Sequence, residues 1–208
     1  MMEGEKLHLE PSSRCTLACP QCSRTAFLDR VAIDDLDIEL AARISSDFKA
    51  MFMVGAHGDP IYHPRFHELV SAVKTASPGI KISMHTNGAF RSESWWQKTA
   101  TLFARGDTVT FSIDGLPRNN HLYRVNSRWD SVELGIKTLR EHNKNVTMRW
   151  KWILFRYNQD DVEEGVDLAK KLGFDYFELI ESDRYQPGHW LTPTVSYGDI
   201  RDKINACG

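Results

Sequence analysis

The stretch from Glu10 to Arg24, EPSSRCTLACPQCSR, carries three of the four cysteines of the chain, at positions 15, 19 and 22. It directly follows the run Lys6–Glu10, which is typical of a short strand. Three thiolates at this spacing can wrap one face of a 4Fe–4S cubane, with each thiolate on a different iron. The fourth iron then lacks a protein ligand and is open to a small molecule. The spacing therefore predicts that Cys15, Cys19 and Cys22 hold a 4Fe–4S cluster with one open iron.

Two other interpretations of the triplet stay open, namely a zinc site and three unrelated cysteines. Zinc usually takes four ligands, often from paired Cys-x-x-Cys units, and the sequence has no second pair. Chance clustering is disfavoured because the chain has four cysteines in 208 residues. The iron–sulfur interpretation is therefore the favoured one.

The composition is that of an ordinary globular protein, with 41% apolar and 26% charged residues and a formal net charge of −2. Without a basic run, a partnership with duplex nucleic acid is not expected. No window approaches the length of a membrane span, and the first residues do not resemble a signal peptide. We therefore expect a cytoplasmic protein, where clustered cysteines are better explained by metal than by disulfides.

Strand-like and helix-like patterns alternate along the chain. This order predicts an α/β fold with a parallel sheet, either an open doubly wound sheet or a partial (β/α)₆ barrel like part of a TIM barrel. In both folds, ligands gather at the carboxyl ends of the strands. The predicted strands are Lys6–Glu10, Met51–Gly55, Lys81–His85, Thr108–Asp114, Val146–Phe155 and Phe174–Ile180.

Helix starts are predicted from capping residues. The predicted starts are Asp34 or Asp35, His63-Pro64, Ser92, Asp130 or Ser131, and a capping box at Asp160 and Glu163. Gly173 is predicted to end the fifth helix.

The motif Cys-x-x-x-Cys-x-x-Cys after a first strand resembles the radical S-adenosylmethionine (radical SAM) superfamily. The resemblance covers about Lys6 to Arg184 and implies a partial barrel. It also implies that the open iron binds S-adenosylmethionine. One-electron reduction, by a partner such as flavodoxin or ferredoxin, would cleave it to a 5′-deoxyadenosyl radical that takes hydrogen from substrate. The Cys-Pro-x-Cys form followed by Arg24 resembles the SPASM/twitch branch, although Gln21 stands where many members have an aromatic residue.

The resemblance extends to the ends of later strands and implies further cofactor contacts. Gly55-Ala-His-Gly58-Asp59-Pro60 resembles a motif that binds the methionine ammonium, and His85-Thr86-Asn87-Gly88 resembles a cofactor-lining turn. Asp59 is expected to serve the cofactor rather than folding. The predicted cofactor-binding residues are Gly58, Asp59, Pro60, Thr86, Asn87, Ser112, Asp114 and Arg124. Ser112 and Asp114 are assigned to the ribose and the methionine carboxylate, and Arg124 to that carboxylate.

The fifth strand places Arg149 and Lys151 on one face and Trp150 and Trp152 on the other. If the charged pair faces the barrel interior, it could bind substrate or cofactor. If it faces outward, it is solvated. The sequence leaves both options open, and Glu178, Glu181 and Arg184 raise the same question.

The function expected from these patterns is hydrogen abstraction from a peptide or small metabolite. Two alternatives remain, namely radical modification of a nucleobase or nucleotide, and a non-enzymatic iron–sulfur or zinc protein. Residues 1–186 are expected to form the core barrel and residues 187–208 a connector. The resemblance to the SPASM/twitch branch implies that this connector begins an absent auxiliary domain, in which Cys207 would ligate a second iron–sulfur cluster. The alternative is a naturally short enzyme in which Cys207 is a lone terminal thiol.

Overall fold

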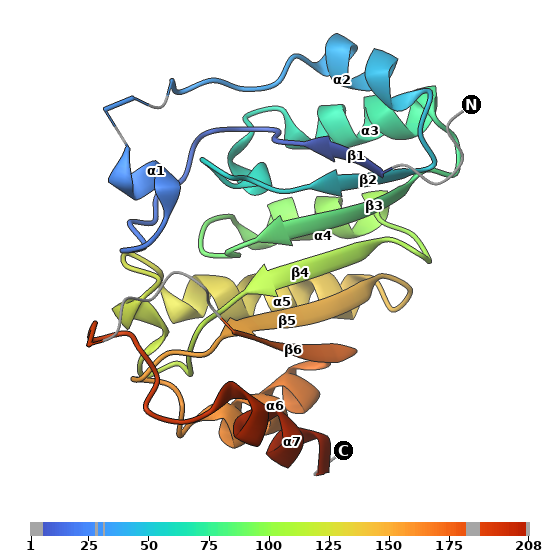
Figure 1. The fold of residues 1–208 in the computed structure, drawn as a ribbon. Helices are drawn as coiled ribbons and strands as arrows, with labels where there is room; N and C mark the ends of the chain where they lie inside the picture. The colour runs from blue at the N-terminus through green and yellow to red at the C-terminus, as the bar shows by residue number, and fades with distance from the viewer. Residues whose placement is uncertain (1–5, 28, 31, 182–187, 207–208) are drawn as a thin grey trace.

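Six parallel strands form one sheet in the computed structural model, which describes residues 6–27, 29–30, 32–181 and 188–206. The strands are β1 (Lys6–Leu9), β2 (Ala50–Met53), β3 (Lys81–Thr86), β4 (Thr108–Ser112), β5 (Thr147–Ile153) and β6 (Tyr176–Ile180). They lie side by side in sequence order, with every adjacent pair parallel. Among the described residues β6 does not pair with β1, so the barrel is partial, as the resemblance implied (Figure 1).

Helices cover one face of this sheet and leave the other open (Figure 1). The helices on this face are α2 (Ile38–Ser45), α3 (Phe66–Ala76), α4 (Glu93–Leu102), α5 (Trp129–His142) and α6 (Val162–Leu172). The helix α1 (Ser23–Ala26) lies beyond the ends of the strands, and α7 (Tyr197–Ala206) lies at the edge of the sheet. The 3₁₀ turns are η1 (Pro60–Tyr62) and η2 (Asn120–Leu122). Alternate strand residues point under the helices and are buried there, for example Met84, Phe111 and Trp150. The hydrophobic core therefore lies between the sheet and its helices, and the opposite face of the sheet is available for a functional site.

Two local predictions of helix ends are confirmed. The side chain of Ser92 accepts a hydrogen bond from the backbone N–H of Trp95 and caps α4. Gly173 ends α6 in the left-handed conformation, at φ 81°, which glycine adopts without steric penalty.

At two other helices the residue at the start differs from the predicted cap. Asp37, not Asp34 or Asp35, caps α2 by accepting from the N–H of Leu40. At α6 the N-cap position is held by Asp161 rather than by the predicted Asp160, and no side chain caps the helix. The Asp161 carboxylate accepts from Arg118 and Asn119.

Two further starts are shifted. Helix α3 begins at Phe66 rather than at Pro64, because the ring of His63 accepts the N–H of Arg65 and forms a turn before it. Helix α5 begins at Trp129, just before the predicted Asp130. Strand β4 ends at Ser112, so Asp114 lies in the loop beyond it.

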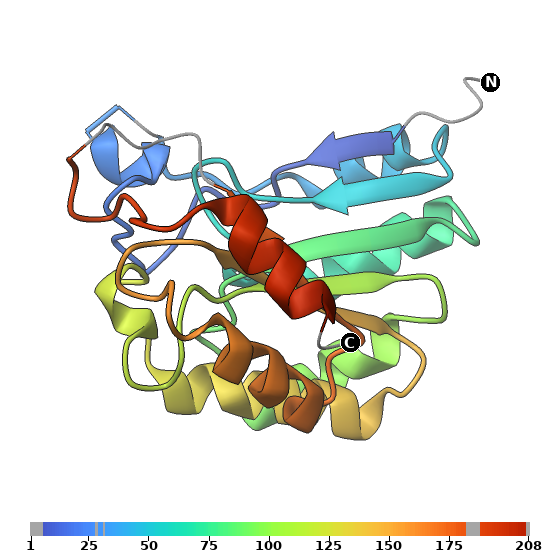
Figure 2. The ribbon, with the colours of Figure 1, turned by 60° about the horizontal axis from the view of Figure 1, so that its bottom comes forward.

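The described part of the predicted connector packs on the barrel. Leu191 is fully buried, and its carbonyl accepts the backbone N–H of Arg156. The hydroxyl of Tyr197, on α7, donates to the carbonyl of Leu179 on β6. Helix α7 lies beside α6 across the edge of the sheet (Figure 2). Arg184, Pro187 and Cys207 lie outside the described residues.

Candidate metal and cofactor site

A cavity of about 460 Å³ opens at the carboxyl ends of the strands. The three cysteines line it together with Gly58, Asp59, Thr86, Asn87, Ser112 and Arg124. Two predicted cofactor contacts, Pro60 and Asp114, are buried but do not line it. The fold therefore brings nine of the eleven predicted site residues to one cavity, because parallel strands place their following loops at the same edge.

The three thiols lie in a setting suited to a metal cluster. Cys19 is buried and Cys15 and Cys22 are half-buried. Burial, with a contribution from Asp59, raises the pKa of Cys15 to about 12, and burial also raises the pKa of Cys19. Thiols that stay protonated in the absence of metal lose their protons when a metal binds, because the metal charge offsets the lost hydration of the thiolate.

Donors approach two of the sulfurs. The side-chain amide of Asn87 lies 3.5 Å from Cys15 Sγ, and Arg124 Nη1 lies 3.9 Å from Cys19 Sγ. Hydrogen bonds to sulfur tune iron–sulfur clusters, so this donor set fits a 4Fe–4S cubane.

The zinc interpretation receives less support from the geometry. Within the described parts of the chain, no three His, Cys, Asp or Glu side chains form a group that could hold a single metal ion. A cubane does not require such convergence, since each thiolate ligates a different iron.

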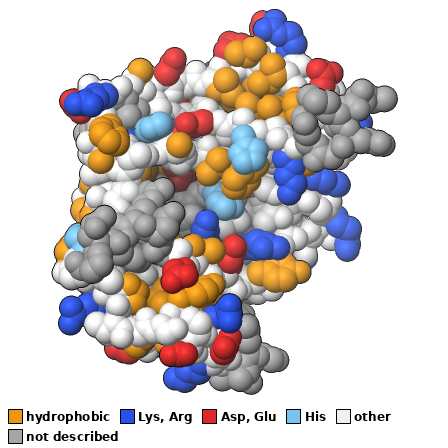
Figure 3. All heavy atoms as spheres, in the orientation of Figure 1, with side chains coloured by type: hydrophobic (Ala, Val, Ile, Leu, Met, Phe, Trp, Pro, Cys, Tyr) orange, Lys and Arg blue, Asp and Glu red, His pale blue; other side chains and the backbone are white. Residues whose placement is uncertain are grey.

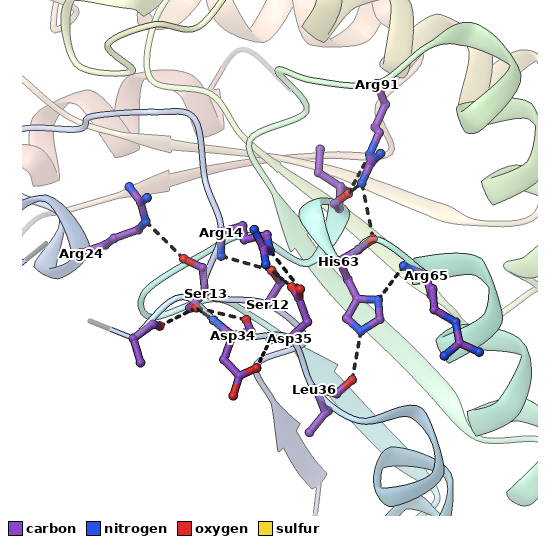
Figure 4. Close-up of polar contacts among 12 residues, drawn as sticks. Ser12, Ser13, Arg14, Arg24, Asp34, Asp35, Leu36, His63, Arg65 and Arg91 are labelled. Atoms are coloured by element: carbon purple, nitrogen blue, oxygen red, sulfur yellow. Dashed lines mark hydrogen bonds and ion pairs between the residues drawn. The ribbon is translucent and has the colours of Figure 1, made fainter. Parts of the chain in front are cut away.

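A clasp of backbone pairing closes the base of the cysteine loop. The N–H of Ser13 donates to the carbonyl of Asp34, and the N–H of Leu36 donates to the carbonyl of Pro11. The pairing of residues 11–13 with residues 34–36 encloses all three cysteines. Figure 4 shows Ser13, Asp34 and Leu36 of this clasp beside His63, whose ring donates from Nε2 to the carbonyl of Leu36. Asp34 and Asp35 thus take part in the clasp instead of capping α2.

Asp35 joins both sides of the clasp. Its carboxylate accepts from Ser12 Oγ at 2.6 Å and from Arg14 Nε at 2.9 Å (Figure 4). On the other side of the loop base, a Cβ on Gly58 would lie 2.0 Å from the carbonyl oxygen of Ser12. Only glycine permits this approach, so the motif Gly58-Asp59 supports the cysteine loop as well as lining the cavity.

We expect Asp35→Ala to loosen the cysteine loop. The substitution removes both hydrogen bonds and should lower the free energy of unfolding by about 1–3 kcal/mol. It should also speed the removal of iron from the reconstituted protein by a chelator. Asp29→Ala is the matched control, because the Asp29 side chain is 79% exposed and lies 3.8 Å from Arg30. Equal chelation rates in the two variants would contradict a supporting role for Asp35.

Asp59 has a structural role that the sequence did not indicate. Its Oδ1 accepts from the N–H of Ile61 at 3.1 Å and its Oδ2 accepts from the N–H of Asn87 at 2.6 Å. The carboxyl is 5% exposed, and burial raises its pKa to about 6 despite these hydrogen bonds. Asp59 thus connects the η1 turn to the end of β3.

We therefore expect Asp59→Ala to destabilise the fold, contrary to the expectation that Asp59 serves the cofactor rather than folding. Two backbone N–H groups would be left buried without their acceptor, at a cost of about 1–3 kcal/mol each. Urea unfolding measures the loss. Asp59→Asn keeps one acceptor oxygen and should lose less. An unfolding midpoint for Asp59→Ala equal to that of the unsubstituted chain would refute the structural role.

Thr86, Asn87 and Gly88 form a turn that faces the cysteines. Thr86 Oγ1 accepts the N–H of Gly88, and Asn87 Oδ1 accepts the N–H of Ala89. Gly88 has φ 66°, a conformation that favours glycine. The turn thereby orients the Asn87 amide towards Cys15.

Asp114 and Arg124 form a buried ion pair. Arg124 Nε lies 2.6 Å from Asp114 Oδ2, and Asp114 Oδ1 accepts the N–H of Ile153. Asp114 is fully buried, and the Arg124 side chain is 16% exposed. The resemblance implied that both residues contact the cofactor, but in the structure the two side chains form an ion pair with each other. The exposed part of Arg124 is what faces the cavity.

Several cavity residues were missed because they carry no local signal. Leu17, Tyr123 and Phe155 pack with Cys19 and Leu191 in a second apolar cluster, distinct from the core under the sheet. Leu17, Tyr123 and Arg24 also line the cavity. Arg24 Nε donates to the carbonyl of Ser13 and ties the helix after Cys22 to the loop base.

The chain resembles known proteins both in sequence and in fold. A profile of the Radical SAM superfamily matches residues 9–169. The tungsten-containing aldehyde ferredoxin oxidoreductase cofactor-modifying protein of Pyrococcus furiosus is 34% identical over 116 residues, which are 53% of this chain and 31% of that protein. The chain thus spans about a third of that relative's length.

Solved structures share the fold. SuiB of Streptococcus suis, bound to S-adenosylmethionine, has a TM-score of 0.74 at 19% identity over 97% of this chain and 46% of its own. For anSMEcpe with bound AdoMet (S-adenosylmethionine), the TM-score is 0.71 at 17% identity, over 89% of this chain and 55% of its own. SuiB has also been solved with its precursor peptide SuiA, and anSMEcpe with the Cp18Cys peptide.

A search of the described residues finds no helix with the length and apolarity of a membrane span. The profile match includes the cysteine loop and most of the barrel, and the fold agrees with it. The chain therefore belongs to the radical SAM superfamily.

Proposed function

We propose that this chain is the catalytic core of an enzyme that uses a 4Fe–4S cluster and S-adenosylmethionine to abstract hydrogen from a peptide or small metabolite. The observation that carries the proposal is the shared cavity. Three thiols at the superfamily spacing line it together with the turns that follow β2 and β3. When bound, the cluster supplies the electron that cleaves S-adenosylmethionine to methionine and a 5′-deoxyadenosyl radical.

The residues of this chain hold and shield the reacting groups. Cys15, Cys19 and Cys22 would ligate the cluster. Arg124 brings positive charge close to Cys19 Sγ, which favours an electron-rich cluster. The apolar cluster of Leu17, Tyr123, Phe155 and Leu191 excludes water from the side of Cys19.

Polar groups on the cavity wall would orient the cofactor. Gly58, Asp59, Thr86, Asn87 and Ser112 present backbone and side-chain oxygens there, which suit the ammonium and hydroxyl groups of S-adenosylmethionine. Pro60 and Asp114 would act indirectly, through the η1 turn and through the position of Arg124.

A peptide or small-metabolite substrate is favoured over a nucleotide by two considerations. SuiB and anSMEcpe share the fold and have been solved with peptides. The net charge of −2 gives no field that would attract a polyanion. Flavodoxin or ferredoxin is the proposed class of reductant, and a cytoplasmic setting would keep the thiols reduced.

Formation of 5′-deoxyadenosine tests the proposal. The protein, reconstituted anaerobically with iron and sulfide, is reduced in the presence of S-adenosylmethionine. Cleavage to methionine and 5′-deoxyadenosine is the expected result. The assay is then repeated with peptide and nucleotide pools, and a stimulation by peptides alone would favour the proposed substrate class. A protein that binds iron but never yields 5′-deoxyadenosine would be a binding protein, and the proposal would fail.

A further inference from the structure

The open face of the sheet carries a cationic pair on β5. In this strand buried and half-buried residues alternate, with Trp150 and Trp152 under the helices and Arg149 and Lys151 on the open face. Figure 3 looks onto this face and shows histidine, hydrophobic and Lys/Arg side chains close together near its centre. The pair therefore faces the interior of the partial barrel, which decides the question that the sequence left open.

Among the described residues, neither cation has an acidic partner. No ion pair or hydrogen bond joins either side chain to another described residue. Register places Thr110 and Tyr176 beside Arg149, and Ser112 and Glu178 beside Lys151. The guanidinium of Arg149 lies 4.6 Å from the centroid of the Tyr176 ring. Among these four register neighbours, Glu178 is the one with a carboxylate, and it forms no ion pair with Lys151.

An aromatic surface adjoins the pair. The rings of His8, Phe52 and His85 meet edge to face across β1, β2 and β3, with centroids 5.1 and 4.6 Å apart. Burial, together with Lys151 and Arg149, lowers the pKa of His85 to about 4. His85 is therefore uncharged at neutral pH, and the charged groups that act on it are the two cations of β5.

The surface is continuous with the cavity. Lys151, His85 and Ser112 line the same cavity as the three cysteines. A molecule on the open face would therefore lie next to the proposed radical. Two half-buried cations without a partner are costly to keep in a folded protein unless a ligand supplies the missing charge.

On the basis of the proposed function, we infer that Arg149 and Lys151 bind an anionic group of the substrate, either a carboxylate or a phosphate. The His8, Phe52 and His85 rings would contact the uncharged part of the same molecule. The pair would thus anchor the substrate against β5 while its reacting carbon faces the cluster. Arg149 suits this role because a guanidinium can bind two oxygens of one anion at once.

The test measures binding of two small anions, pyrophosphate and tricarballylate, by titration calorimetry on the reconstituted protein saturated with S-adenosylmethionine. Saturable binding of one or both is expected, and the preferred probe distinguishes phosphate from carboxylate. Lys151→Met and Arg149→Met should each weaken binding about tenfold, since hydrogen bonds to charged groups contribute about 1.5–3 kcal/mol. Lys151→Arg keeps the charge and should retain binding, and Glu178→Gln should tighten it.

Lys144→Met is the matched control. It removes the same charge from an exposed position before β5 and should leave binding within about twofold, because surface charges are screened by salt. Equal affinities in Lys151→Met, Arg149→Met and the control would overturn the inference, as would a lack of saturable binding to the unsubstituted protein. If anions bind only without S-adenosylmethionine, the pair serves the cofactor and the substrate assignment is wrong.

The two proposals can fail separately. If the enzyme forms 5′-deoxyadenosine but the affinity for anions does not change when Arg149 or Lys151 is substituted, the proposed function stands and the inference is wrong. If anion binding follows the pair but no 5′-deoxyadenosine forms, the surface is a binding site and the proposed radical chemistry falls.

Discussion

Replacing Cys15, Cys19 and Cys22 together with alanine is expected to abolish iron binding. The unsubstituted chain should hold about four irons after anaerobic reconstitution, and the triple variant none, because no other described residues form a metal-binding group. Iron and sulfide assays, with the electron paramagnetic resonance of the reduced cluster, measure the change. Formation of 5′-deoxyadenosine should disappear with the cluster.

Cys207→Ala controls for the loss of a thiol elsewhere in the chain. It removes the fourth cysteine of the sequence and should leave the iron content and the resonance signal intact. Stoichiometric zinc in the purified protein, or full iron retention in the triple variant, would contradict the cluster assignment.

Replacing Arg124 with methionine is expected to produce the largest loss of stability. Methionine fills much of the arginine volume but leaves the buried Asp114 carboxylate without its cation. Breaking one side of a buried ion pair costs about 3–5 kcal/mol, whereas a neutral pair of similar size does not carry that penalty. Urea unfolding should therefore show a much lower free energy for Arg124→Met than for the double variant Asp114→Asn/Arg124→Met. In the double variant, asparagine can still accept the N–H of Ile153.

Arg118→Met is the matched control for the ion pair. Arg118 binds Asp161 and Glu164, but its side chain is 53% exposed, so its ion pairs are screened by solvent. Its loss should therefore lower the free energy of unfolding far less than the loss of Arg124 does. If Arg118→Met and Arg124→Met destabilise the protein equally, or if the double variant is no more stable than Arg124→Met, the Asp114–Arg124 pair does not have the role assigned here.

The substitution of Arg124 should also alter the cluster. Arg124 Nη1 lies 3.9 Å from Cys19 Sγ, so its removal takes positive charge from one ligand. A more negative reduction potential is expected, because the reduced cluster carries more negative charge. The potential separates this effect from simple loss of folding, provided that it is measured on the fraction that remains folded.

Much of the fold was accessible from contiguous sequence. The strand runs and the helical patterns gave the parallel α/β order, because hydrophobic periodicity is a local property of the chain. The cap at Ser92 and the stop at Gly173 were accessible for the same reason, since each depends on residues within one turn. Asp34 and Asp35 were assigned wrongly as helix caps, because their partners Ser13, Ser12 and Arg14 are distant in sequence.

The sequence by itself determined the chemistry: three cysteines within one short loop after a strand predict a cluster site, and the motif places the chain among relatives confirmed by the family profile. Tertiary structure alone decided which polar groups meet each other. It assigned Asp114 to Arg124, gave Asp59 two backbone partners, and turned Arg149 and Lys151 to the open face. The physical reason is that a charged side chain is satisfied by polar groups that lie within about 3 Å of it in the folded chain. Those neighbours come from segments distant in sequence, which only the folded sheet brings together.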